Sequence, residues 1–202
     1  MLNEQRTGDI KSSDGAVNPA RSDKQGAGVV TQAHGNYNEA VIRGNVYFGA
    51  NQAAVTTTIA LAATYTGLCI GNPAGSGFNL SILKAGWAFS VAPAAIASAH
   101  LASGFASTGI ATHTTPLNVY NAKIGAPVRS VATVDGAATL VGTPIYMQPL
   151  IGGFTAAALF SQPAALTDIG GSIVVASGGY VCIVTLTVGV GFGCIVWEEI
   201  PE

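Results

Sequence analysis

Residues 73–84 read PAGSGFNLSILK, in which a turn signal runs directly into a strand signal. The turn signal is Pro73–Gly77, because proline, glycine and serine accommodate the backbone angles of tight turns. After it, every second side chain shares a face of the extended chain. One face then carries Phe78, Leu80 and Ile82, and the other carries Asn79, Ser81 and Leu83. We therefore predict a turn followed by a β-strand.

The same alternation of strands and turns recurs along the rest of the chain. Extended stretches are predicted at residues 40–48, 56–70, 86–91, 117–124, 128–134, 143–151, 172–176, 180–188 and 193–198. Turns are predicted at Val134-Asp135-Gly136, at Ser177-Gly178-Gly179 and at the connection Gly189–Gly193. About ten short strands with such turns are typical of an antiparallel β-sandwich. We expect an all-β fold with a jelly-roll-like topology.

Two alanine-rich stretches do not follow this pattern. Ala92–Ala102 is predicted to be a loop or one short helix, because alanine has the highest helix propensity but Pro93 and flanking strands disfavour a long helix. Ala156–Leu159 is ambiguous in the same way.

Charged side chains are almost missing from most of the chain. From Gly44 to Trp197 only five residues are charged, namely Lys84, Lys123, Arg129, Asp135 and Asp168. A free soluble monomer carries about a quarter charged residues, most of them on its surface. The outside of this body is therefore expected to be covered by membrane or by other protein chains.

Membrane and nucleic acid are both disfavoured as partners. No stretch resembles a spanning helix of ~20 apolar residues, and the opening MLNEQRTGDIKSSDG lacks the apolar segment of a secretion signal. An outer-membrane barrel would also need aromatic girdles, which are thin here. The net charge of -2 and the lack of adjacent basic residues argue against binding a phosphate backbone. Contacts with other protein chains remain the favoured explanation.

The chain is predicted to have two parts, an arm of residues 1–36 and a β-sandwich body of residues 37–202. The arm mixes both charge signs with small polar residues and lacks hydrophobic periodicity. Such a composition cannot bury enough surface to fold alone. It is either a disordered tail or an arm that becomes ordered across neighbouring subunits, and the bare body favours the second.

No pattern of catalytic, cofactor-binding or metal-binding residues is found, so we expect neither an enzyme nor a cofactor. Turn and surface roles are expected for the acidic residues Asp135, Asp168, Glu198 and Glu199. No GxSxG motif is present, and polar or cavity-lining roles are expected for His34, His100 and His113, which lack metal-ligand spacing.

Cysteine and tryptophan are expected to serve packing. Cys69, Cys182 and Cys194 are predicted to be buried thiols, although a disulfide between Cys182 and Cys194 would follow if their strands formed a hairpin. Trp87 and Trp197 lie in apolar strands. Core or intersubunit packing is therefore preferred for them over a sugar-binding surface.

Several short phrases resemble structural proteins encoded among the virion genes of tailed bacteriophages. These are residues 34–44 (HGNYNEAVIRG), 45–50 (NVYFGA), 72–80 (NPAGSGFNL), 86–92 (GWAFSVA) and 196–199 (VWEE). The resemblance spans most of residues 34–199 and includes no active-site motif.

The resemblance implies a virion component made in the host cytoplasm. It suggests a capsid decoration (cement) protein with a β-sandwich fold, often a homotrimer, that binds the major capsid protein or another virion protein. Two alternatives remain open. One is a head-fibre, spike or tail protein that binds a host-surface glycan, and the other, less favoured, is an enzyme of the cell envelope.

Overall fold

The computed structural model describes residues 35–57, 61–95, 97–104, 109–154, 166–185 and 187–202. The chain divides into one unit of residues 1–39 and another of residues 40–202, and the fold described below is that of the second. The predicted arm, except for Gly35 and Asn36, lies outside the described residues, as does Ala156–Leu159. No helix in the described part is both long and apolar enough to span a membrane.

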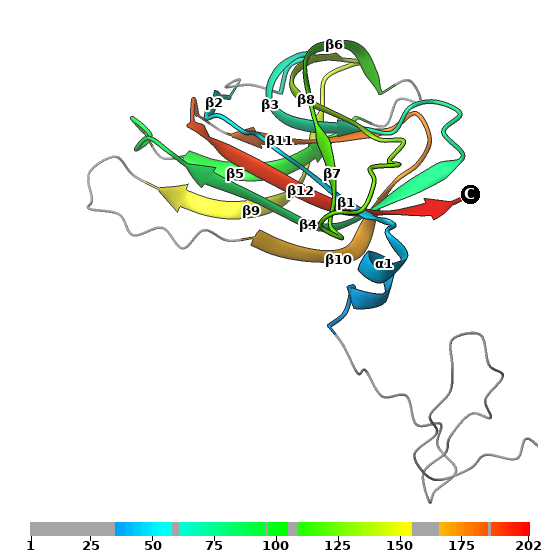
Figure 1. The fold of residues 1–202 in the computed structure, drawn as a ribbon. Coiled ribbons are helices and arrows are strands. Elements are labelled where there is room, and N and C mark those ends of the chain that lie inside the picture. The colour runs from blue at the N-terminus through cyan, green and yellow to red at the C-terminus, as the bar shows by residue number, and fades with distance from the viewer. Residues whose placement is uncertain (1–34, 58–60, 96, 105–108, 155–165, 186) are drawn as a thin grey trace, which may run out of the picture. The chain divides into compact units, whose positions relative to one another are not determined.

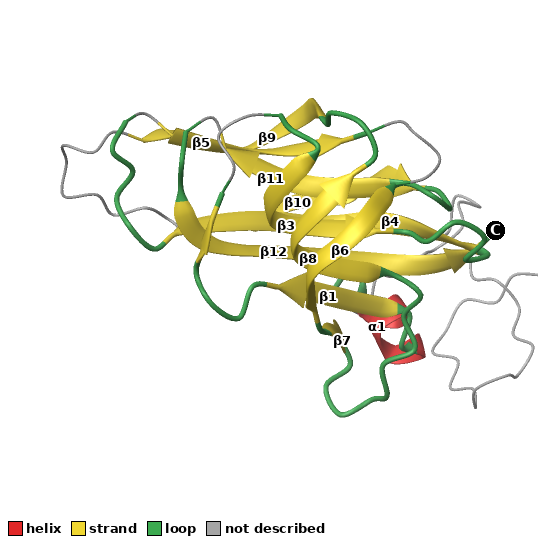
Figure 2. Cartoon of the chain, turned by 90° about the horizontal axis from the view of Figure 1, so that it is seen from above, coloured by secondary structure: helices red, strands yellow, loops and turns green. Residues whose placement is uncertain are grey.

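Twelve strands and one short helix make up the described part of the chain (Figures 1 and 2). The helix is α1 (Asn38–Arg43). The strands are β1 (Val46–Ala50), β2 (Val55–Thr56), β3 (Thr64–Gly71), β4 (Phe78–Phe89), β5 (Ala97–Ser103), β6 (Ile110–Leu117), β7 (Val119–Asn121), β8 (Thr133–Leu140), β9 (Ile145–Phe154), β10 (Leu166–Val175), β11 (Tyr180–Thr185) and β12 (Val190–Pro201). The predicted all-β fold is confirmed.

The strands form two antiparallel six-stranded sheets. Sheet 1 has the order β10-β4-β12-β1-β7, with β2 paired to β12, and sheet 2 has the order β6-β8-β3-β11-β5-β9. Strands from opposite ends of the chain pair in a nested series: β1 with β12, β3 with β11, β4 with β10, and β5 with β9. A long hairpin rolled up in this way is a jelly roll, so the predicted β-sandwich is jelly-roll-like.

The other strands decorate one side of this jelly roll. Strands β6, β7 and β8 lie in the connection between β5 and β9. From there β7 extends sheet 1 beside β1, and β8 with β6 extends sheet 2 beside β3. No described strand is added on the opposite side of the sandwich, where β10 and β9 are the edge strands of the two sheets.

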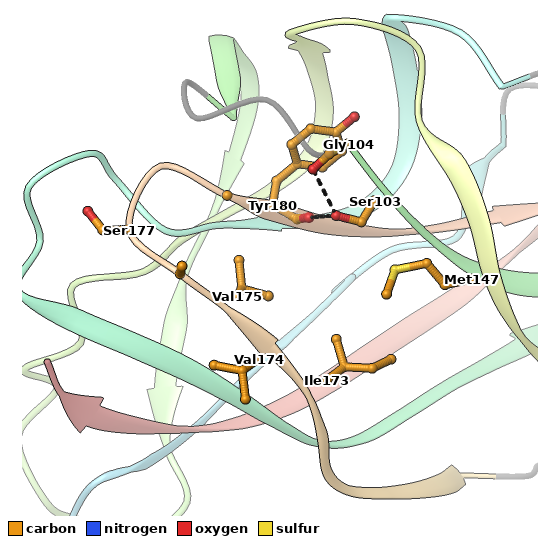
Figure 3. A pocket seen from close by; sticks show the side chains of 10 residues that line it. Ser103, Gly104, Met147, Ile173, Val174, Val175, Ser177 and Tyr180 are labelled. Atoms are coloured by element: carbon orange, nitrogen blue, oxygen red, sulfur yellow. Dashed lines mark hydrogen bonds between the residues drawn. The ribbon is translucent and has the colours of Figure 1, made fainter.

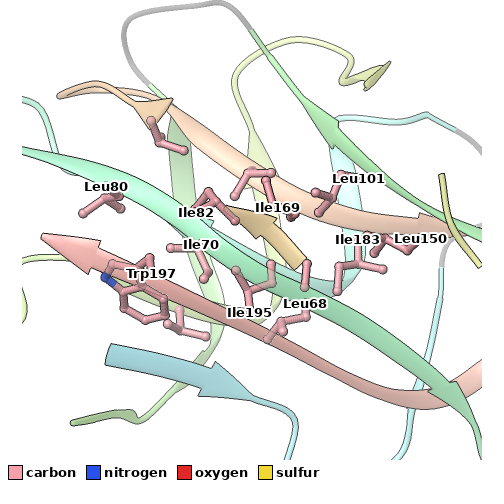
Figure 4. Close-up of a cluster of buried hydrophobic side chains, with 14 of the residues drawn as sticks. Leu68, Ile70, Leu80, Ile82, Leu101, Leu150, Ile169, Ile183, Ile195 and Trp197 are labelled. Atoms are coloured by element: carbon pink, nitrogen blue, oxygen red, sulfur yellow. The ribbon is translucent and has the colours of Figure 1, made fainter. Parts of the chain in front are cut away.

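The core lies between the sheets and consists mostly of aliphatic side chains (Figure 4). Its largest fully buried members include Trp87, Trp197, Leu68, Ile82 and Ile183. Burying each large side chain contributes about 1.5–3 kcal/mol. This explains how a chain with few aromatic residues can hold two broad sheets together.

Strand β4 confirms the predicted alternation and adds one irregularity. Its residues Leu80 and Ile82 face the core, as do Ala85 and Trp87, although the two pairs differ in parity. The switch occurs at a register shift where Ile82 pairs with Trp197 and Lys84 pairs with Val196. The extra residue is a β-bulge, which lets one strand present a continuous apolar face.

Several local predictions were wrong. Residues 40–43 belong to α1, in which Glu39 and Arg43 complement the helix dipole. Ala97–Ser103 is strand β5, because pairing with β11 and β9 outweighs the helix propensity of alanine. Val134-Asp135-Gly136 is not a turn but the middle of β8, and β12 begins within the predicted connection Gly189–Gly193.

Candidate functional site

Asp135 is fully buried, so the predicted turn and surface role is wrong for this residue. Its side chain is 0% exposed, and one oxygen, Oδ2, lies 2.7 Å from Nδ1 of His113 on the edge strand β6. The other oxygen, Oδ1, is buried without a hydrogen-bond partner. Burial raises the pKa of Asp135, and the bond and charge of His113 partly oppose that rise.

His113 and Asp135 resemble two members of a catalytic triad. The imidazole is 42% exposed and lines a pocket of about 230 Å³ with Asn72, Ile110 and Thr133 among its walls. Among the described residues, no serine or cysteine hydrogen-bonds this imidazole. The contact between His113 and Asp135 links the edge strand β6 to β8.

Glu199 is also buried, at 5% exposure, against the prediction of a surface role. Its carboxylate accepts hydrogen bonds from Ser130 Oγ at 2.5 Å, from the Val131 amide at 3.0 Å and from Trp197 Nε1 at 3.4 Å. Glu198 is only half-buried, as expected for neighbouring residues on opposite faces of a strand. Glu199 thus ties the segment before β8 to the C-terminal strand.

The remaining acid and histidine candidates are dispersed. Asp168 is exposed on β10, as predicted, opposite Lys84 of β4. His100 Nε2 lies 2.8 Å from Ser98 Oγ, and its ring packs on Tyr146 with centroids 5.1 Å apart. Burial lowers the pKa of His100. His34 lies outside the described residues.

The three cysteines are free thiols. Cys182 lies in sheet 2 directly opposite Cys69 of β3, whereas Cys194 lies in sheet 1. The strands of Cys182 and Cys194 therefore form no hairpin, and the alternative of a disulfide between them is wrong. Cys69 and Cys182 are buried as predicted, and burial raises the pKa of both. Cys194 is only half-buried.

Both tryptophans are core residues, as preferred from the sequence. Trp87 is 2% exposed, and Trp197 is fully buried. Neither ring can stack on a sugar without unfolding of the sandwich. In the described part of the chain, no group of three His, Cys, Asp or Glu side chains is placed to hold a metal ion.

The surface is even poorer in charge than the sequence indicated. Of the five charged residues between Gly44 and Trp197, Asp135 is buried and Lys84 is half-buried. Only Lys123, Arg129 and Asp168 are exposed. The side chains exposed on β6 are instead alanine, threonine, proline and the single His113.

A hollow lies on the side of the sandwich formed by β9 and β10 (Figure 3). Its volume is about 310 Å³, and Met147 of β9 and Ile173, Val174 and Val175 of β10 line it. At its rim, Ser103 Oγ donates hydrogen bonds to the Tyr180 and Gly104 carbonyls. We name the exposed parts of β9 and β10 together with this hollow the open edge. Sequence patterns alone did not indicate it.

Comparison with family models, with curated proteins and with solved structures finds no match to this chain. The function therefore has to be argued from the residues and their arrangement.

Proposed function

We propose that this chain is a structural subunit of a bacteriophage particle, and specifically a capsid decoration protein. In this proposal it self-associates, with a trimer as the expected assembly, and binds the major capsid protein or another virion protein. The observation that carries the proposal is the surface of residues 44–197, on which only three charged side chains are exposed. The virion assignment rests further on the sequence resemblance given above.

A β-sandwich stays soluble when the edges of its sheets are protected. Free-standing β-sheets protect their edges with charged side chains, proline or covering segments, because unprotected edges associate. Obligate interfaces are more apolar than transient ones. A body that keeps so few charges on its surface is thus suited to permanent contact with other chains. Several weak contacts joined in one oligomer would then clamp a shell through their combined strength.

The jelly-roll fold itself is compatible with this role but does not select it, because one fold hosts many functions. The alternative of a glycan-binding fibre or spike gains no support from Trp87 and Trp197, since both rings are buried. Decoration of a shell is therefore preferred.

Two measurements test the proposal. The mass of the purified full-length chain, measured by sedimentation from low micromolar to near-millimolar concentration, should correspond to an oligomer. Particles assembled without this chain should bind it when it is added back and should then resist heat or chelators better. A chain that stays monomeric and also fails to bind such particles would contradict the proposal.

A further inference from the structure

The open edge exposes apolar side chains from two edge strands on one side of the sandwich. On β9, three consecutive residues, Ile145, Tyr146 and Met147, are exposed, and on β10 Val174, which lines the hollow, is exposed. Consecutive strand residues point to opposite faces. Among the described residues, both faces of β9 are therefore only partly covered at this point, with the ring of His100 packed on Tyr146.

The two edge strands separate from each other toward this region. Thr167 Oγ1 of β10 donates a hydrogen bond to the Leu150 carbonyl of β9 at 3.3 Å, which ties the sheets together near one end. Farther along, Met147 and Ile173 line the hollow of about 310 Å³ instead of closing on each other (Figure 3). Ile173 also packs against the main core. The open edge is thus a place where the core is reachable from outside.

Charge does not protect this edge. Asp168 is the only charged residue on β9 and β10, and it lies opposite Lys84 on the outer face of sheet 1. Natural edge strands are usually protected by lysine or by inward-pointing charges. On β9 the one protective feature is Pro149, which lies beyond the exposed stretch.

We infer that the open edge is the contact surface between two copies of this chain, an inference that rests on the proposed self-association. The occupant must be uncharged here, because an ionised group placed in the hollow would lose its hydration without a counter-charge. The surface of a second copy meets this requirement, because only three charged side chains are exposed on residues 44–197, and an open edge that packs against a different face of the next copy can close a ring of three.

The size of the open edge also suits such a contact. Each of its two strands is ten residues long, or about 33 Å. Two sheets ~10 Å apart with their outer side chains make a side roughly 20 Å deep. The resulting face of roughly 600–700 Å² approaches the ~800 Å² per partner of a stable interface.

The contact is expected to form by side-chain packing rather than by continuation of the sheet. Strand β9 shows three register shifts against β5 and contains Pro149, so its outer edge is irregular. Such an edge is a poor template for strand addition. Ile145 and Met147 would instead pack against uncharged exposed side chains of the neighbouring copy.

The test compares matched isoleucine-to-lysine substitutions. Ile145 lies at the open edge and is 56% exposed, whereas Ile124 lies in the turn after β7 and is 96% exposed. Ile145→Lys should weaken self-association at least tenfold in sedimentation experiments, and Ile124→Lys should leave it unchanged. Met147→Lys should act like Ile145→Lys. Fluorescence of the buried Trp87 and Trp197 verifies that each variant remains folded.

The outcomes separate this inference from the proposed function. A wild-type chain that associates while folded Ile145→Lys and Met147→Lys associate equally well would overturn the inference and leave the proposed function standing. An effect of Ile124→Lys as large as that of Ile145→Lys would overturn it too. A wild-type chain that never associates would count against both. Amide hydrogen exchange adds an independent measure, because residues 145–149 should gain protection as concentration rises.

Discussion

Removal of the Glu199 carboxylate should destabilise the body strongly, although the residue is close to the end of the chain. This side chain accepts hydrogen bonds from the Val131 amide, from Ser130 Oγ and from Trp197 Nε1. In Glu199→Ala these donors lose a charged acceptor in a buried place. The neighbouring Glu198 points to the opposite face, where it is half-buried.

The expected magnitude follows from the number of stranded donors. A buried donor left without its acceptor costs about 1–3 kcal/mol. Two of the donors, the Val131 amide and the indole of Trp197, cannot turn to another acceptor as the Ser130 hydroxyl can. We therefore expect Glu199→Ala to lower the free energy of unfolding by roughly 2–4 kcal/mol. Glu198→Ala, the matched control, should change it by less than about 0.5 kcal/mol.

Denaturant unfolding followed by tryptophan fluorescence measures both variants, at one fixed protein concentration so that association does not alter the comparison. The indole of Trp197 bonds to Glu199 directly, so its emission should also shift in folded Glu199→Ala. Glu199→Gln keeps one acceptor oxygen and should fall between Glu199→Ala and the wild type. If Glu199→Ala lost no more stability than Glu198→Ala, the reasoning about this carboxylate would be refuted.

Three further predictions concern pH and the arm. Because the pKa of Asp135 is raised in the folded protein, its contribution to the free energy of unfolding is fully present below the usual pKa of 3.8 and is lost as the pH rises through the folded pKa. The free energy of unfolding of the wild type, relative to that of Asp135→Asn, should therefore fall over this pH range. Parallel pH profiles for the two proteins would contradict this. The lowered pKa of His100 makes stability change with pH in the opposite direction. The contribution of His100 to the free energy of unfolding is present above its usual pKa of 6.5 and is lost as the pH falls through the folded pKa. Acid should therefore destabilise the wild type more than His100→Asn, by less than about 1 kcal/mol for a half-buried imidazole. Equal acid sensitivity of the two proteins would contradict this prediction. Deletion of residues 1–36 should weaken particle binding while the thermal unfolding of the body stays the same, and full-strength binding by the truncated chain would exclude a role for the arm.

Sequence patterns correctly predicted those turns and strands that depend mainly on residues close together in the chain. The turn at Pro73–Gly77 and the strand after it depend on residues within the stretch itself, so both were readable. Asp135 is a residue for which the local pattern predicted the wrong structure. An Asp-Gly pair favours a turn, but here the carboxylate is buried against His113, a partner 22 residues away. Only the three-dimensional pairing of β6 with β8 brings these residues together.

Other features of the fold depend on pairing between strands far apart in the sequence, and local patterns did not predict them. Ala97–Ser103 is strand because β5 lies between β11 and β9, and no property of alanine indicates that position. The open edge arises because β6, β7 and β8 extend the two sheets on one side of the sandwich, whereas no described strand is added on the other side. The scarcity of charged residues predicted that part of the surface is covered by a partner, but it did not indicate which part of the surface.

The nested pairing has a consequence for the synthesis of the chain. Strand β12 occupies the middle of sheet 1, between β4 and β1, yet it comes after all the other described strands in the chain. During elongation, the sides of β1 and β4 that face β12 have no partner strand until β12 is added, although β1 can already pair with β7 on its other side. Pairings this distant form slowly and leave incomplete chains prone to aggregation. A truncated chain that lacks β12 is therefore expected to leave sheet 1 incomplete, with β4 and β1 unjoined.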